Sequence, residues 1–318
     1  MPKFALETGG MKLRSYQTPV ALAVCRSILQ RQGLSFVVMF PRQSGKNELQ
    51  AQIEAYLLTL YSQTKADLVK VSPTAKPQSL NAMRRLERVL KGNICTHDHW
   101  RKDCGYIYRL GTARITFLSG EPTAQIVGAT ANVLLEVDEA QDVETAKYDK
   151  EIAPMAASTN ATRIFWGTAW TSQTLLAREL RLARQAEQAD GIQRAFVLTA
   201  DQVAQEVPAY GRFVQEQVSR LGRQHPLVRT QYYSEEVDAQ GGLFPASRQA
   251  IMQGRHPSQT LPLPMEQYVF TIDIAGADET PPPVVGAGLR PAPTGPAPTT
   301  DSGRDATALT IVQLIHNP

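Results

Sequence analysis

Short apolar runs alternate with amphipathic segments along the first two thirds of the chain. Runs of strand length lie at Phe36–Phe40, Leu68–Thr74, Val133–Val137 and Arg163–Trp166. The segments between them repeat apolar residues every three or four positions, as over residues 77–90, and this spacing is typical of helices that pack by one face. Strands that alternate with helices predict an α/β fold, with an open, mostly parallel sheet that binds ligands at the carboxyl ends of its strands.

Two further patterns complete this part of the chain. Residues 105–118 alternate around Gly111-Thr112, which predicts an antiparallel hairpin. A long helix is predicted over residues 172–189, and arginines form a stripe along it. A solvated helix face is the simplest interpretation of such a stripe, and contact with a subunit or with DNA is the alternative. The stripe consists of Arg178, Arg181 and Arg184.

The composition changes near Val207-Pro208. A helix-rich stretch comes first, and the apolar run Tyr268–Asp273 then predicts a strand of a new unit. A Pro/Gly/Ala-rich segment, poor in large apolar residues, separates it from a last strand at Ala308–Ile315. Because two strands cannot bury a core of their own, we expect this last unit to be incomplete. The predicted division is residues 1–206, a helical linker at 207–262, and a third part at 263–318 with a disordered insert at 280–303.

Composition and charge narrow the class of protein. The 318 residues include 33 Lys and Arg against 30 Asp and Glu, so the formal net charge is +3, which is compatible with a phosphate-backbone partner. No run approaches the roughly 18 apolar residues of a membrane helix, and the N-terminus lacks a signal-peptide core, so we expect no membrane association. Three cysteines, an odd number, favour a reducing compartment over a disulfide framework.

The segment between the first strand and the helix after it has the pattern of a phosphate-binding loop. Backbone N–H groups at a helix N-terminus hold phosphate oxygens, and a lysine adds a mobile positive charge. The consensus GxxxxGK[ST] is broken at its first position by Phe40 and at its last by Asn47, whose carboxamide replaces a metal-binding hydroxyl. A solvated lysine at a helix start is the alternative interpretation. The loop comprises Pro41, Arg42, Gln43, Ser44, Gly45, Lys46 and Asn47.

Two adjacent carboxylates follow another apolar strand. Asp138 and Glu139 come directly after Val133–Val137. In such a pair one carboxylate can hold Mg²⁺ while its neighbour polarises an attacking water. Taken alone, the pair is also compatible with a polar strand end before an N-capped helix. Together, and in this order along the chain, the loop and the carboxylate pair predict ATP hydrolysis.

In these and other segments the chain resembles the large terminase subunit of tailed bacteriophages, the motor that packages DNA into capsids. The resemblance extends from about Leu13 to the end, and an RQxGK loop in place of GxxxxGK is characteristic of that family. It implies a RecA-like P-loop ATPase domain, a helical linker and the beginning of a ribonuclease H-like nuclease domain. The segments that carry it are Leu13-Arg14-Ser15-Tyr16-Gln17, Arg42–Lys46, Ser72-Pro73-Thr74, Val137–Gln141, Gly167–Trp170, Gln231-Tyr232, Gly242–Pro245 and the Asp273 strand.

The resemblance implies roles around a bound ATP. Lys46 is expected at the β- and γ-phosphates, with Arg42 touching the γ-phosphate from the same chain. Asp138 is expected in the Mg²⁺ shell with Asn47 close by, and Glu139 is expected to orient the attacking water.

The segment before the first strand is expected to recognise the base of the nucleotide. Gln17 can pair with adenine through its carboxamide, as glutamine does on adenine in a DNA groove, and Tyr16 can stack on the base. The alternative is that Tyr16 anchors the core and Gln17 lies on the surface.

Gly167, Thr168 and Ala169 lie where the family places its coupling motif, a strand-end loop that senses the γ-phosphate. A tight turn before the next helix is the alternative. The family often carries an arginine just before the glycine that corresponds to Gly128, but Val127 occupies that position here. The trans-acting arginine is therefore unassigned among Arg101, Arg109, Arg114 and Arg163.

Asp273 resembles the first metal ligand of the family's nuclease, which holds two Mg²⁺ or Mn²⁺ ions to cut DNA. Asp305 is a further candidate, with a solvated linker residue as its alternative. The remaining acids of that site do not follow in this chain, so we expect endonuclease activity only in a full-length chain.

Four residues have the side chains of a zinc site but not its spacing. Cys95, His97, His99 and Cys104 are separated by gaps that match no common zinc finger, so a metal site is the disfavoured interpretation.

The sequence as a whole predicts an ATP-driven motor subunit that translocates double-stranded DNA into a viral procapsid. The implied partners are DNA, the small terminase subunit, the portal protein and further copies of the chain in a ring. The expected location is the cytoplasm of the bacterial host, transiently at the procapsid portal and not in the mature virion. A RecA-like helicase or DNA-remodelling ATPase, and a non-enzymatic prophage remnant, remain as alternatives.

Overall fold

The computed structural model describes residues 1–126, 128–237, 267–273 and 308–314. The chain divides into two compact units, Met1–Met252 and Gln253–Pro318, and each is considered by itself. The boundary predicted at residues 206–207 falls inside the first unit. The predicted insert at 280–303 and Asp305 lie outside the described residues.

The first unit is built on an eight-stranded sheet with the strand order β3-β4-β5-β2-β6-β7-β1-β8. Every pairing from β5 through β8 is parallel, while β4 and β3 add an antiparallel edge. The α/β fold predicted from the alternating pattern is therefore confirmed. The strands are β1 (Ser35–Met39), β2 (Ala66–Ser72), β3 (Trp100–Asp103), β4 (Ile107–Leu110), β5 (Ala113–Ser119), β6 (Leu134–Val137), β7 (Thr162–Gly167) and β8 (Ala195–Val197).

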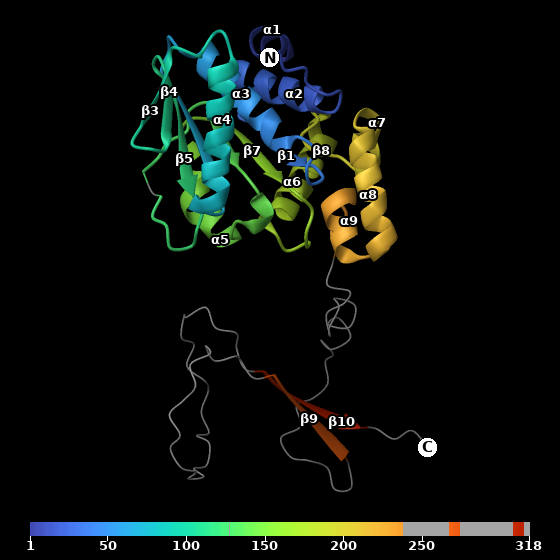
Figure 1. The fold of residues 1–318 in the computed structure, drawn as a ribbon. Helices are drawn as coiled ribbons and strands as arrows, with labels where there is room; N and C mark the ends of the chain where they lie inside the picture. Colours follow the sequence, from blue (N-terminus) through green and yellow to red (C-terminus); the bar gives the residue numbers. More distant parts are fainter. Residues whose placement is uncertain (127, 238–266, 274–307, 315–318) are drawn as a thin grey trace, which may run out of the picture. The chain divides into compact units, whose positions relative to one another are not determined.

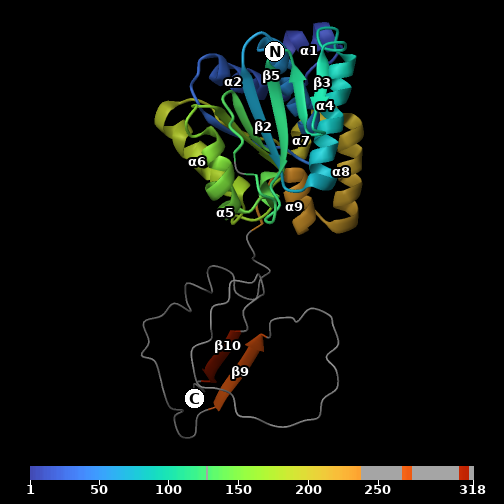
Figure 2. The same ribbon diagram turned by 90° about the vertical axis from the view of Figure 1, so that its left-hand side faces the viewer.

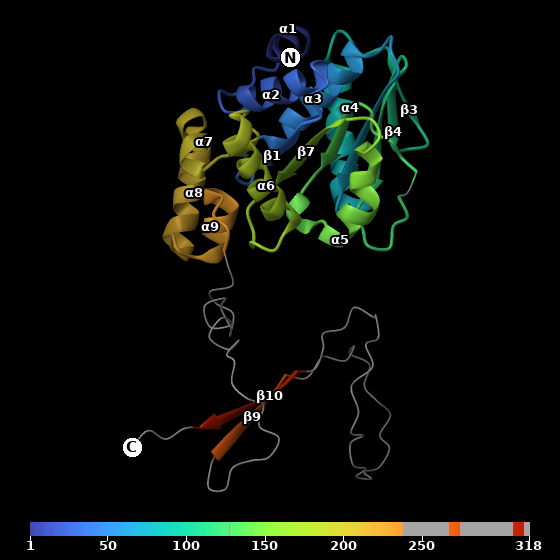
Figure 3. The ribbon, with the colours of Figure 1, turned by 180° about the vertical axis from the view of Figure 1, so that it is seen from behind.

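Helices cover both faces of this sheet, as Figure 2 shows with α4 on one side and α5 and α6 on the other. Figure 1 looks onto the α4 face, and Figure 3 onto the α6 face. The main helices are α1 (Pro2–Gly9), α2 (Gln17–Leu29), α3 (Lys46–Leu60), α4 (Leu80–Gly92), α5 (Thr145–Lys147), α6 (Leu175–Asp190), α7 (Ala200–Glu206), α8 (Pro208–Leu221) and α9 (Pro226–Tyr233).

Alternate residues of each strand enter one of two hydrophobic cores. On β1, Phe36 and Val38 pack with α2 and α3, whereas Val37 and Met39 pack with α6. Because both faces are covered, the central strands are apolar at nearly every position, and this is why the sequence shows continuous runs there. The core on the α3 face also takes in residues of α8, so the helices after residue 206 are packed onto the sheet rather than standing apart from it.

Three short elements escape the sequence pattern. The predicted hairpin is present as β4 and β5, but β3 extends it as a third antiparallel strand. The four residues of β3 are mostly polar and carry no alternation, and β8 has only three residues. The first helix, α1, is likewise too short to show a clear period.

The second unit contains the two strands predicted near the end of the chain. They are β9 (Gln267–Asp273) and β10 (Ala308–Leu314), which pair antiparallel so that Asp273 lies opposite Ala308. Within the described residues, no helix is long and apolar enough to span a membrane.

Leu57 and Leu60 of α3 provide a matched test of the packing on this face. Leu57 is fully buried, whereas Leu60 is 44% exposed. We expect Leu57→Ala to lower the free energy of unfolding by about 2–5 kcal/mol, because it removes buried methyl groups and leaves a cavity. Leu60→Ala should change it by less than about 0.5 kcal/mol. Urea unfolding of both variants measures the difference, and equal losses would contradict this packing.

Candidate functional site

Three neighbouring strands end at the same level of the sheet. In the parallel register Met39 of β1 lies beside Gly167 of β7, and Phe165 lies beside Val137 of β6. The loop after β1, the carboxylates after β6 and the predicted coupling residues after β7 are therefore brought together at one edge, as the sequence predicted.

The loop after β1 turns sharply into α3. We call residues Phe40–Asn47 the 40–47 loop. Its backbone enters the left-handed region at Gln43 (φ 63°) and at Gly45 (φ 91°). At Gly45 a side chain would also be crowded, because an added Cβ would lie 2.9 Å from Gln17 Nε2. Glycine is therefore required there, and it lets Lys46 begin a 15-residue helix whose N-terminus opens at the loop.

The inner side of the loop is held by the segment before α2. Tyr16 donates its hydroxyl to the Ser44 carbonyl (2.8 Å), and Arg14 Nη1 donates to the same oxygen (3.0 Å). Burial raises the pKa of the Tyr16 phenol above its ordinary value, although Arg14 acts against this, so the hydroxyl keeps the proton that it donates. Gln17 Nε2 donates to the Gly45 carbonyl (3.0 Å), and its Oε1 accepts from the Arg14 amide (2.9 Å).

The structure packs Tyr16 against the core, as its alternative interpretation has it, and holds Gln17 against backbone. Gln17 is 1% exposed rather than on the surface, and both ends of its carboxamide bind backbone. Tyr16 packs edge-on against Phe40, with ring centroids 5.8 Å apart. Neither side chain lines the cavity described below, so contact with adenine stays a prediction that this arrangement does not favour.

The outer side of the loop is held by the helices after residue 206. Tyr210 of α8 donates its hydroxyl to the Arg42 carbonyl (2.9 Å), and the Arg42 amide donates to the carbonyl of Gln231 in α9 (2.9 Å). The 40–47 loop is therefore fixed between a segment that precedes it closely in the chain and helices that follow it by more than half the chain's length.

Lys46 and Glu139 meet across the strand ends. Lys46 Nζ lies 3.0 Å from Glu139 Oε1 and 3.5 Å from the Thr168 hydroxyl. Lys46 is only 6% exposed, so it is not the solvent-side charge that a loop lysine suggests. Glu139, the residue after Asp138, has a left-handed backbone (φ 44°). This conformation turns its side chain back toward the 40–47 loop.

Gln141 connects Glu139 with the loop after β7. Its Nε2 donates to Glu139 Oε2 (2.9 Å), and its Oε1 accepts from the Thr168 amide (3.1 Å). Gly167 allows this approach, because a Cβ at that position would lie 2.3 Å from Gln141 Oε1. Lys46, Glu139, Gln141 and Thr168 thus form a closed set of contacts. Sequence analysis assigned Gln141 no role of its own, although it is part of the Val137–Gln141 segment.

Asp138 lies beneath these residues and is 3% exposed. Its Oδ1 accepts from Gln50 Nε2 (2.9 Å) and from the Glu139 amide (3.1 Å). Among the described residues no group of three His, Cys, Asp or Glu side chains is placed to hold a metal. One buried carboxylate instead fits a Mg²⁺ ion that completes its shell with phosphate oxygens and water.

A cavity of about 620 Å³ opens above the strand ends. Most of the predicted loop residues line it, with Lys46, Glu139, Thr168 and Ala169, whereas Ser44, Asp138 and Gly167 do not. Burial raises the pKa of the Asp142 carboxyl in its wall, and the neighbouring Glu139 adds to the rise. The lining residues to which sequence analysis gave no role in the site are Glu48, Gln78, Asn81, Arg85, Gln141, Asp142, Trp170 and Gln231.

Three of these omissions had a signal in the sequence. Gln78, Asn81 and Arg85 are spaced by three and four positions, so they share one face of the helix predicted over residues 77–90, opposite its apolar stripe. Arg85 Nη1 lies 3.2 Å from Glu48 Oε2 and adds a second arginine to the cavity beside Arg42. None of the arginines proposed to act in trans lines the cavity, and three of them bind acids of the same chain: Arg101 and Arg109 bind Asp103, and Arg114 binds Asp67.

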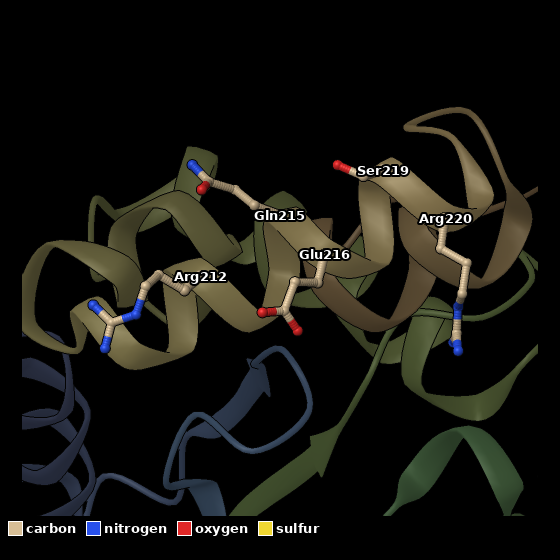
Figure 4. A pocket seen from close by; sticks show the side chains of 5 residues that line it. All are labelled: Arg212, Gln215, Glu216, Ser219 and Arg220. Carbon is tan, nitrogen blue, oxygen red and sulfur yellow. The ribbon is translucent and has the colours of Figure 1, made fainter.

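The remaining candidates lie elsewhere. Arg178 binds Asp149 and Glu179, so part of the basic stripe is neutralised within the chain. Cys95, Cys104 and their neighbouring histidines form no metal cluster within the described residues. Asp273 is the last residue of β9. Figure 4 shows a second, open cavity of about 570 Å³, lined only by residues of α8: Arg212, Gln215, Glu216, Ser219 and Arg220.

The sheet order, the glycine-turned loop at the start of α3 and the carboxylates at the neighbouring strand ends define a RecA-like α/β fold. The chain has this fold in common with the ATPase domains of phage large terminases. It matches the large terminase ATPase domain of Thermus phage P74-26 with a TM-score of 0.56 and 17% identity, over 73% of this chain and 97% of that one.

Two longer terminases match as well. The large terminase of a thermophilic bacteriophage gives a TM-score of 0.54 at 14% identity, over 82% of this chain and 62% of that one. The HK97 bacteriophage large terminase gives a TM-score of 0.55 at 14% identity, over 71% of this chain and 51% of that one. This chain therefore spans between about half and two thirds of these two proteins. The resemblance noted in the sequence is confirmed at the level of the fold.

Comparison by sequence adds nothing to this: no protein-family model matches the chain, and no curated protein matches it.

Gly167 gives a test of the close approach between the two strand-end loops. In Gly167→Ala the new Cβ would lie 2.3 Å from Gln141 Oε1 and 2.5 Å from Leu176 Cδ2. We expect a loss of about 1–3 kcal/mol in the free energy of unfolding, because an overpacked site must shift its neighbours. Gly92→Ala is the control, since nothing lies within 4 Å of its added Cβ. Denaturant unfolding that places both variants at wild-type stability would contradict this geometry.

Proposed function

We propose that this chain is an ATP-hydrolysing motor subunit of the large-terminase type, which translocates double-stranded DNA into a viral procapsid. The observation that carries the proposal is the 3.0 Å contact between Lys46 Nζ and Glu139 Oε1 at the ends of parallel strands. It sets a cation suited to phosphate beside a carboxylate suited to water, where folds of this kind bind ligands. The fold likeness to terminase ATPase domains supports it, and the terminase of the thermophilic bacteriophage has been solved with ADP and with ATP-γ-S.

The polarity of the cavity suits a triphosphate. The N-terminus of α3, Lys46, Arg42 and Arg85 all present positive charge to it. Phosphate oxygens that bind Lys46 compete with Glu139 for the same ammonium group. Once displaced, Glu139 Oε1 is free to accept a hydrogen bond from the attacking water, while Oε2 remains held by Gln141.

The same exchange reaches the loop after β7. Thr168 touches Lys46 through its hydroxyl and Gln141 through its amide. Its position therefore depends both on phosphate bound to Lys46 and on the position of Glu139. This is the arrangement that a coupling loop requires. Mg²⁺ bound with the nucleotide would neutralise phosphate charge, and Asp138 with Asn47 are the residues that would hold it.

The partners follow from the motor function. The proposal includes double-stranded DNA, the small terminase subunit, the portal protein of the procapsid and other copies of this chain in a ring. It places the chain in the cytoplasm of the bacterial host, at the portal during packaging. The proposal also includes Asp273 as a first metal ligand of a nuclease site.

Glu139→Gln is the sharpest test of the ATPase proposal. The change keeps the shape of the side chain but removes the charge that polarises water, so we expect turnover to fall by about 10²-fold or more with little change in nucleotide affinity. Steady-state ATP hydrolysis measures turnover. The fluorescence of Trp170, a half-exposed side chain in the cavity wall, reports nucleotide binding.

Two comparison variants make this result specific. Glu144→Gln alters an exposed carboxylate that does not line the cavity, and it should hydrolyse ATP as the wild type does. Lys46→Ala should abolish turnover while the far-UV circular dichroism stays that of a folded chain. A collapse of affinity in Glu139→Gln would instead make Glu139 a binding or structural group.

Gln17→Leu separates two roles for Gln17. If its carboxamide holds the loop backbone, Gln17→Leu removes a hydrogen bond worth about 1 kcal/mol. The affinities for ATP and for GTP should then both fall by about fivefold. If Gln17 binds adenine instead, only the affinity for ATP should fall. Titration of both nucleotides decides between the two, with Gln30→Leu at the exposed end of α2 as the control.

A further inference from the structure

Three ionisable side chains are buried between α3 and the sheet, next to the strand ends. Lys70 of β2 is 2% exposed, Glu54 of α3 is 0% and Glu136 of β6 is 1%. Lys70 Nζ lies 2.7 Å from Glu54 Oε1 and 3.9 Å from Glu136 Oε2, and Trp166 Nε1 donates to Glu136 Oε2 at 2.9 Å. Burial alone would lower the pKa of Lys70, but the surrounding carboxylates raise it above its ordinary value, so the ammonium stays charged.

Stability alone does not account for this cluster. Taking ions out of water costs free energy that their mutual attraction seldom exceeds, and apolar residues of similar volume usually serve a core as well. The cluster is also incompletely satisfied, because Glu54 Oε2 and Glu136 Oε1 are buried without a hydrogen bond in the described part of the chain. The buried ammonium group of Lys70 therefore calls for a role other than packing.

Gln50 connects the cluster to Asp138. Lys70 Nζ donates to Gln50 Oε1 (2.7 Å), and Gln50 Nε2 donates to Asp138 Oδ1 (2.9 Å). An ammonium group can only donate, so it accepts one orientation of the carboxamide, with the oxygen toward Lys70. The NH₂ end must then face Asp138. The charge on Lys70 therefore fixes the orientation of the Gln50 carboxamide between Lys70 and Asp138.

The hydrogen bond from Gln50 determines which oxygen of Asp138 is available to a cation. Oδ1 already accepts from Gln50 and from the Glu139 amide, which also stops the carboxylate from rotating. Oδ2 makes no hydrogen bond among the residues that the structure describes, and it is the oxygen left for a cation. Without Gln50, only the backbone amide would hold the carboxylate.

We propose that Gln50, oriented by Lys70, is a positioning residue for Asp138 and presents its Oδ2 to the divalent cation that enters with the nucleotide. The inference rests on the proposed ATPase function and adds to it two residues from α3 and β2. Partners that orient a metal ligand in this way affect metal affinity although they do not touch the metal.

The test measures how much Mg²⁺ tightens nucleotide binding, a quantity that does not depend on turnover. ATP-γ-S is titrated calorimetrically with and without Mg²⁺, and the ratio of the two dissociation constants is the Mg²⁺ effect. In Gln50→Leu we expect this ratio to fall by about 10-fold or more, with metal-free binding close to wild type. Gln50→Met, which keeps the length of the side chain without its hydrogen bonds, serves if the leucine variant does not fold.

Gln52→Leu is the matched control. Gln52 is buried on the same helix, at 4% exposure, but it binds Glu48 and not Asp138. It should retain the full Mg²⁺ effect. An unchanged Mg²⁺ effect in both Gln50 variants would overturn the inference. A wild-type chain that binds no ATP-γ-S, or binds it without regard to Mg²⁺, would instead refute the proposed function itself.

Discussion

Lys46 and Glu139 reach across the ends of three parallel strands to form one ion pair, and the chemistry of this chain is arranged around it. Their side chains can meet only because β7 lies between β1 and β6 in a register that ends all three strands together. A slip of one residue on any of them would exchange the two faces of that strand and turn its apolar residues out of their cores. The hydrophobic pattern that builds the sheet therefore also fixes the distance between the two charges.

The surroundings of the pair come from segments that are far apart in the sequence. The loop that carries Lys46 is braced from one side by Tyr16 and Gln17 and from the other by Tyr210 and α9. Glu139 is held by Gln141, and Asp138 by Gln50. Such bracing keeps the groups in place before any ligand binds, which reduces the ordering that binding must supply. The helices after residue 206 therefore contribute to the site as well as to the core.

The sequence was most informative where one physical requirement dominates. Buried strands need apolar runs and the loop needs Gly45, so β1, β2, β6, β7 and the 40–47 loop were predicted close to their observed positions. The backbone contacts of Gln17 could not be predicted, because a carboxamide can bind a base or a backbone equally well and only the fold brings the Gly45 carbonyl to it. Asn81 and Arg85 were not predicted as site residues for a related reason: a cavity wall is assembled from several elements and has no period of its own.

The polar character that hid β3 from the sequence pattern has a consequence of a different kind. This strand forms one edge of the sheet in the described part of the chain, and an open edge offers unpaired N–H and C=O groups to any other strand that comes near. Arg101, Lys102 and Asp103 place charges of both signs along it, and burying them in a new strand pair would be unfavourable. Pairing between the β3 edges of neighbouring copies is thus disfavoured even at high local concentration.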